Sequence, residues 1–128
     1  MAEYLPQFAM LYALGCLGII GFQIALIAGA PLGHLTQGGQ HSGALPQSGR
    51  MIAAVSILLL AAMALAILSV AGFWPGWPTW TGWLACAVSA LAMLLNSITP
   101  SLAERRLWSP ITTVMFGLAL AVMLLQTS

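Results

Sequence analysis

Charge is what this chain of 128 residues has least of. It contains no lysine and no aspartate, and its three arginines and two glutamates make up 4% of the sequence, whereas 61% of the residues are hydrophobic. A water-soluble fold would have almost nothing polar to place on its surface. Alternation of apolar and polar residues is also missing, which disfavours a membrane barrel. The composition therefore predicts an all-α integral membrane protein.

Four apolar stretches are long enough to cross the hydrocarbon core of a bilayer, which takes about 20 helical residues. They cover approximately residues 5–29, 50–73, 80–98 and 110–126. We expect a single domain over residues 1–128, a transmembrane four-helix bundle with up-down-up-down topology. The chain begins without the basic region of a cleaved signal, so we expect the first helix to stay in the mature protein.

The distribution of positive charge predicts the orientation. Arg50, Arg105 and Arg106 all fall in the first and third connections between the predicted helices. Short cytoplasmic loops collect basic residues, so we expect these two connections in the cytoplasm and both termini outside it. The second connection and the first turn of the predicted helix after it hold four of the five tryptophans, which favour the headgroup layer of a membrane.

Small residues recur at a spacing of four in three of the predicted helices. The rows are Gly21, Ala25 and Gly29; Gly82, Cys86 and Ala90; and Thr113, Gly117 and Ala121. Such rows let helix backbones approach closely in a membrane. They predict a tight bundle, and the same chemistry suits contact with a second copy or with another membrane protein.

Apart from Ser69, Thr81 and Ser89, the few polar residues singled out inside the predicted helices gather in the half nearer the arginine-bearing connections. They are Gln23, Ser56, Asn96, Thr112 and Thr113. Two interpretations stay open, a polar pocket that opens toward the cytoplasm and ordinary hydrogen bonds between helices. For a pocket, the candidate ligand-binding residues are Gln23, His34, Arg50, Asn96, Thr113, Glu104 and Arg105.

Both arginine-bearing connections carry local structural signals. The first, residues 30–49, is rich in glycine and proline, and irregular backbone at membrane depth must be buried or line water, so we expect it to fold over the end of the bundle. Ser101 and Glu104 have the spacing of a capping box, which predicts a short interfacial helix over residues 101–108. Ser109-Pro110 then repeats a start signal for the fourth transmembrane helix. Helix N-termini, glycine amides and arginines converge at this end, which favours an anion or anionic headgroups.

Motifs for chemistry are scarce. A metal site would need more ligands than His34, His41 and Glu104 supply, so we expect neither a metal nor a cofactor. Glu3 and Glu104 are the only acids, and both fall at predicted interfaces, which disfavours a proton-coupled transporter. No nucleophile and base can be placed together, so we expect no enzymatic activity. Nothing indicates a nucleic-acid partner.

A longer pattern spans most of the chain. It consists of Gly29-Ala30-Pro31-Leu32-Gly33, Gly38-Gly39, Leu45-Pro46 and Arg50, followed by Asn96, Ser101, Glu104-Arg105, Trp108 and Pro110. The pattern resembles a family of small four-helix bacterial membrane proteins with no assigned function, in which an aromatic residue often stands where this chain has Leu32. The resemblance implies a bacterial inner-membrane protein and no particular reaction.

Two functional hypotheses follow. The first is a membrane component without catalytic activity, an accessory subunit or a lipid-interacting protein that contacts lipids, other membrane proteins or itself through its small-residue helix faces. The second is a binding or permeation protein for a small molecule or an anion, with a cytoplasm-facing polar pocket under residues 30–49. Under the first, Gln23 and Asn96 bond to neighbouring helices; under the second, they line a cavity.

Overall fold

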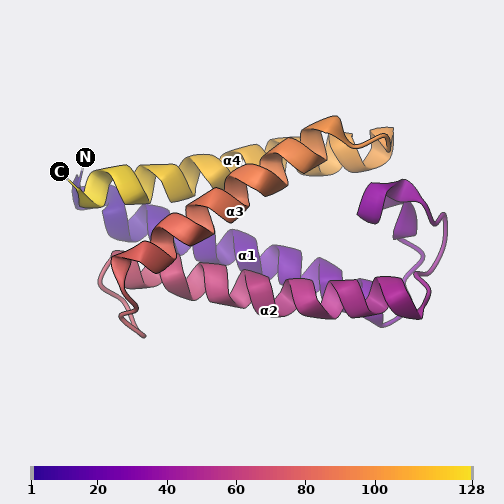
Figure 1. The fold of residues 1–128 in the computed structure, drawn as a ribbon, viewed down its shortest axis with the longest axis horizontal. Helices are drawn as coiled ribbons and strands as arrows, with labels where there is room; N and C mark the ends of the chain where they lie inside the picture. The colour runs from indigo at the N-terminus through magenta and orange to yellow at the C-terminus, as the bar shows by residue number, and fades with distance from the viewer. Residues whose placement is uncertain (1, 128) are drawn as a thin grey trace.

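The computed structural model describes residues 2–127 as four long α-helices joined by three connections (Figure 1). The helices are α1 (Leu5–Ile27), α2 (Gln47–Val70), α3 (Thr79–Ile98) and α4 (Leu102–Gln126), with short 3-10 helices η1 (Ala2–Tyr4), η2 (Gly33–Leu35) and η3 (Gln37–Gly39). All four α-helices are long and apolar enough to cross a membrane. The described residues therefore confirm the predicted all-α four-helix bundle.

Glycines end the first two helices slightly earlier than the apolar stretches predict. Gly29 follows α1 with a φ of 96°, and Gly72 follows α2 with a φ of 94°. Glycine adopts these angles without steric cost. Beside Gly29, the N–H of Ala30 donates to the carbonyl of Ala25 at 3.0 Å, which satisfies a carbonyl at the helix end. The chain can therefore turn at these points although the apolar sequence continues.

The predicted break before the fourth transmembrane helix is wrong. Instead of a separate interfacial helix over residues 101–108, α4 runs continuously through Pro110. Proline removes one N–H from the helix. Beside it, the hydroxyls of Thr112 and Thr113 donate to backbone carbonyls of the preceding turn at 2.7 and 2.6 Å. These bonds engage the carbonyls of Trp108 and Ser109, the two residues before the proline.

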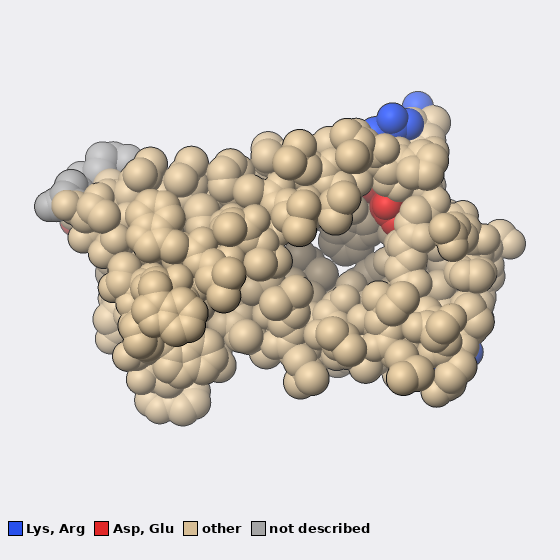
Figure 2. Space-filling view, viewed as in Figure 1, with Lys and Arg blue, Asp and Glu red and all other residues tan. Residues whose placement is uncertain are grey.

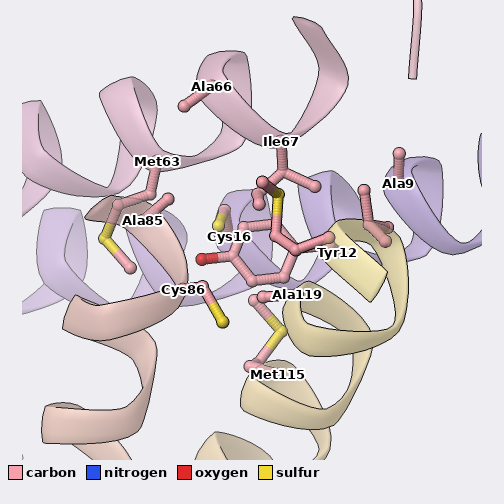
Figure 3. Packing of buried hydrophobic residues seen from close by; sticks show 12 residues of the cluster. Ala9, Tyr12, Cys16, Met63, Ala66, Ile67, Ala85, Cys86, Met115 and Ala119 are labelled. Atoms are coloured by element: carbon pink, nitrogen blue, oxygen red, sulfur yellow. The ribbon is translucent and has the colours of Figure 1, made fainter. Parts of the chain in front are cut away.

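The larger of the two hydrophobic clusters in the described residues lies in the half of the bundle that holds the start of α1, the end of α4 and the α2–α3 connection, and Figure 3 shows how its side chains pack. Its buried side chains are Ala9, Tyr12, Cys16, Met63, Ala66, Ile67, Ala85, Cys86, Met115, Ala119, Val122 and Met123. The smaller cluster joins the end of α1, the first connection and the start of α2 at the other end, and its buried side chains are Leu26, Leu45 and Ala53. Tyr12 Oη lies 2.6 Å from Ser89 Oγ, and Ser89 donates to the carbonyl of Ala85 at 2.9 Å. A hydroxyl has one proton, so Tyr12 donates to Ser89 and joins α1 to α3.

One of the small-residue rows is used inside the bundle. Gly82 is buried, and a Cβ built on it would lie 2.5 Å from Cγ2 of Val70 and 2.7 Å from Sδ of Met123. By contrast, Gly21 and Gly117 are exposed, and a Cβ there would meet none of the described residues within 4 Å. The row on α3 therefore brings that helix close to α2 and α4, while α1 and α4 each present an open glycine on the outside.

Candidate ligand-binding cavity

The half of the bundle nearer the first connection is hollow. A cavity of about 640 Å³ lies between the four helices and residues 36–38, and its volume is in the range of small-molecule sites, about 300 to 1,000 Å³. Much of its wall is apolar. The polar lining residues are Gln23, Thr36, Gln37, Ser56, Asn96, Thr99, Glu104 and Thr112.

The cavity opens on the side of the bundle. From their connection, α2 and α3 diverge toward the opposite end (Figure 1), and Figure 2 shows a hollow on the face between them. The lining side chains Leu59 and Leu95 are 46% and 54% exposed. The sequence predicted an opening toward the cytoplasm, at the end of the bundle. In the structure the first connection covers that end, and the hollow visible in Figure 2 faces sideways.

Trp108 holds the first connection over the end of the bundle. Its Nε1 donates to the carbonyl of Leu35 at 2.8 Å. Its ring packs edge-on against the ring of Phe22 on α1, with 4.8 Å between the centroids. Since both rings line the cavity, one aromatic pair joins α1, α4 and the connection at the cavity wall.

Ser101 provides a second attachment for the same connection. Its Oγ accepts from the N–H of Glu104 at 3.2 Å, which confirms it as the N-cap of α4, and donates to the carbonyl of His34 at 3.0 Å. Gly39 packs directly on this serine, because a Cβ built on Gly39 would lie 2.6 Å from Ser101 Cβ. The φ of Gly39 is 71°, so both space and backbone conformation favour glycine.

Glu104 contributes the one charged side chain in the cavity lining. It is 6% exposed, and its Oε2 accepts from the N–H of Gly38 at 3.1 Å. In a complete capping box this carboxylate would accept a hydrogen bond from the N–H of Ser101. In the structure that N–H donates to Thr99 Oγ1 at 3.4 Å. Within residues 2–127, no arginine forms an ion pair with Glu104. The positive end of the α4 dipole stabilises the carboxylate, while its charge stays unneutralised by a side chain.

Three side chains of the wall retain unused hydrogen-bonding capacity. Asn96 donates from Nδ2 to the carbonyl of Ala92 at 2.8 Å, but its Oδ1 accepts no bond from the described residues. The same holds for Oε1 of Glu104 and for both polar atoms of the Gln23 amide. In the described part of the chain, no side-chain nitrogen or oxygen is both fully enclosed and unpaired. These atoms therefore border open space, where a bound molecule can reach them.

The structure brings together three of the predicted site residues, Gln23, Asn96 and Glu104. It adds Gln37 and Gly38 of the first connection, together with Trp108. The sequence held a signal for Trp108, which belongs to the longer pattern of residues that spans most of the chain. It held none that placed Gln37 and Gly38 at the cavity, because their position depends on how the first connection packs against α4.

The other predicted site residues do not line the cavity. Arg50 donates to the carbonyls of Leu45 and Ile27 at 2.9 and 3.5 Å, so its positive charge lies at the negative end of the α1 dipole. His34 is exposed and contributes its backbone carbonyl, and Thr113 is exposed and bonds within α4. Arg105 also lies outside the lining, and Figure 2 shows basic side chains on the outer surface of this end.

A second hollow continues the cavity toward the α2–α3 connection. It measures about 240 Å³ and lies in the groove between α2 and α3. Leu59, Met63 and Val88 line both hollows. The groove is apolar apart from Thr81, whose hydroxyl donates to the carbonyl of Pro78 at 2.6 Å. A cavity with polar side chains in part of its wall is thus joined to an apolar groove.

The fold and the cavity define a helical bundle of four potentially membrane-spanning helices with a lateral opening. Within residues 2–127, no group of three or more His, Cys, Asp or Glu side chains is placed to hold a metal ion. No known protein family, curated protein or solved structure matches the chain. The resemblance to small bacterial membrane proteins therefore stays a prediction, and the function has to be argued from the cavity.

Proposed function

We propose that this protein is an integral membrane protein that binds a small molecule in the cavity and catalyses no reaction on it. The observation that carries the proposal is the unpaired hydrogen-bonding capacity of Gln23, Asn96 and Glu104 around a cavity of about 640 Å³. Buried polar groups normally have partners. Of the two hypotheses, this arrangement favours the cavity over side chains that bond only to neighbouring helices.

The proposed location is the inner membrane of a bacterium. Its support is the length and apolar character of the four helices, the family resemblance and the position of the arginines. Arg50 lies at the start of α2, and Arg105 and Arg106 lie near the start of α4, at the same end of the bundle. Because cytoplasmic segments collect basic residues, we place this end in the cytoplasm and the start of α1 and end of α4 outside.

Binding fits the geometry better than permeation or anion recognition. Beyond the cavity the bundle is filled, because Tyr12, Ala119 and Met123 are 0% exposed in the core. A path through the bundle would have to cross this packed region. An anion would meet the carboxylate of Glu104, whereas the guanidinium of Arg50 bonds to backbone carbonyls away from the cavity.

An accessory subunit is the second candidate function. The exposed glycines of α1 and α4, Gly21 and Gly117, favour it because a Cβ at either position would meet no described residue within 4 Å. A partner helix could therefore approach closely there. This candidate predicts a protein partner in native membranes rather than a molecule in the cavity.

Mass spectrometry of the full chain, purified in mild detergent, separates the two candidates. Ala92 lines the cavity, so Ala92→Phe should fill part of it, whereas Ala87 is exposed on α3 outside the lining and Ala87→Phe is the matched control. We expect wild type and Ala87→Phe to retain a small molecule that Ala92→Phe loses, with equal helical circular dichroism in all three. A consistent protein partner and no small molecule in any of them would contradict the proposal.

A further inference from the structure

We infer that the cavity takes an amphiphile with an ammonium head, which lies beside Glu104 while its apolar chain occupies the α2–α3 groove. This inference rests on the proposed function and adds the chemical class of the ligand. It follows from the charge of the wall, from the continuity of the two hollows and from the direction of the opening.

The wall is complementary to a cation that donates hydrogen bonds. Its one charge is the carboxylate of Glu104. Among residues 2–127, Oδ1 of Asn96 and Oε1 of Gln23 are also unpaired acceptors, whereas Nε2 of Gln23 is the one unpaired donor of these three side chains. The carboxylate is 6% exposed and no cationic side chain of the described residues lies beside it, so an ammonium group at this position would supply the opposite charge. The rings of Phe22 and Trp108 line the same cavity, and aromatic rings attract ammonium groups. An anionic or purely apolar head would leave the acceptors of Glu104, Asn96 and Gln23 unpaired.

The groove suits the chain of an amphiphile. From Ser56 in the polar cavity to Ala66 in the groove, the two hollows follow roughly 15 Å of α2. Apolar side chains shared by both hollows make the path continuous, and the one hydroxyl in the groove, that of Thr81, is bonded to the backbone. A chain leaving the polar cavity therefore finds an apolar path parallel to the helices.

The lateral opening indicates how such a ligand enters. The first connection covers the end of the bundle, whereas the hollow between α2 and α3 faces sideways (Figure 2). In a membrane that side faces the lipid. An aminophospholipid of the bilayer and a free amphiphilic ammonium compound share the required chemistry, and both can enter from the leaflet.

Native mass spectrometry of the full chain in neutral maltoside micelles tests this assignment with chain-matched probes. Dodecylammonium is compared with dodecanol, and dioleoylphosphatidylethanolamine with dioleoylphosphatidylglycerol. We expect dodecylammonium to bind at least about tenfold more tightly than dodecanol, because it adds a charge-assisted contact and a cation–π contact. The same preference for phosphatidylethanolamine identifies a bilayer lipid as the source, and a preference confined to dodecylammonium identifies a free compound. Equal affinity for dodecylammonium and dodecanol would overturn the assignment of the head.

Charge variants locate the head. Glu104→Gln keeps an oxygen that can accept from Gly38 but removes the charge, so the preference for dodecylammonium should disappear while the circular dichroism stays unchanged. Glu3, the other acid, is exposed at the opposite end of the bundle, and Glu3→Gln should leave the preference intact. A preference that survives Glu104→Gln, or that Glu3→Gln abolishes, overturns the inference.

Groove variants locate the chain and separate this inference from the proposed function. Ala62 lines the groove, whereas Ala54 is exposed on α2 away from both hollows. Ala62→Phe should weaken dodecylammonium binding and Ala54→Phe should not. If Ala92→Phe abolishes binding while neither the charge on the head of the probe nor Ala62→Phe changes the affinity, the ligand class is wrong and the proposed function stands. If binding survives Ala92→Phe, both fall.

Discussion

Replacing Trp108 with phenylalanine isolates one hydrogen bond between the first connection and α4. The variant removes the bond from Nε1 to the carbonyl of Leu35, 2.8 Å long, and keeps a ring that can still pack against Phe22. The net contribution of such a bond is about 1 kcal/mol, which corresponds to a roughly fivefold larger population of the detached connection. We therefore expect local detachment and an intact core.

Amide hydrogen exchange measured by mass spectrometry reports this detachment. The N–H groups of Thr36, Gly38 and Gly39 bond within the connection or to Glu104, so their exchange should accelerate about fivefold in Trp108→Phe if it proceeds through local opening. Amides of the core half of α4 should exchange at the wild-type rate. Unchanged exchange in residues 33–39, or equal acceleration throughout the chain, would refute the reasoning.

A second variant tests the same attachment from the other side. Gly39→Ala would place a methyl group against Ser101 and strain a backbone with a φ of 71°. Gly76 has a similar φ of 76°, but a Cβ there meets none of the described residues within 4 Å. Gly76→Ala therefore carries the conformational cost, about 1 kcal/mol, without the contact. We expect amide exchange in residues 33–39 to accelerate more in Gly39→Ala than exchange around Gly76 accelerates in Gly76→Ala, because only Gly39→Ala also disturbs the contact with Ser101. Equal acceleration in the two variants would contradict a role for this contact.

Three further predictions concern the core and the orientation. Ser89→Ala should lower the free energy of unfolding by about 1 kcal/mol, since it removes the acceptor of the buried Tyr12 hydroxyl; equal stability of the variant and wild type in denaturant titrations would contradict this. Gly82→Ala should cost about 1 to 3 kcal/mol by overpacking, whereas Gly117→Ala, with open space around it, should leave the thermal midpoint nearly unchanged. Ser42 is exposed in the first connection, so an impermeant thiol reagent should label the variant Ser42→Cys only after cells are permeabilised. Labelling in intact cells would reverse the proposed orientation.

The helices were the predictable part of the fold. Each apolar stretch is long enough to require a helix in a membrane, and all four occur. Pro110 shows the limit of local signals. Ser109-Pro110 is typical of a helix start, but the preceding segment is continuous with α4. Contacts of Glu104 and Trp108 with the first connection, which no local pattern reveals, hold that segment in place.

The site was partly predictable for the same reason. Gln23 and Asn96 were identified because polar residues are rare inside the apolar helices. Most of them gather in the half of the predicted helices nearer the arginine-bearing connections. The lateral opening depends on distant pairs: Gly82 brings α3 close to α2 at one end, and Ser101 and Trp108 attach the first connection at the other. Arg50 was assigned to the site from its charge, but the carbonyl of Ile27, 23 positions away, engages it.

Nuclear Overhauser effects from the side-chain amide protons of Gln23 test the central claim most directly. This amide makes no hydrogen bond with the described residues and lines the cavity. In the full chain with dodecylammonium added in deuterated maltoside micelles, we predict cross-peaks from Gln23 to the methylene protons beside the ammonium group. Cross-peaks only to side chains of neighbouring helices, unchanged by the added amphiphile, would show that the bundle is closed there and that the cavity binds no such ligand.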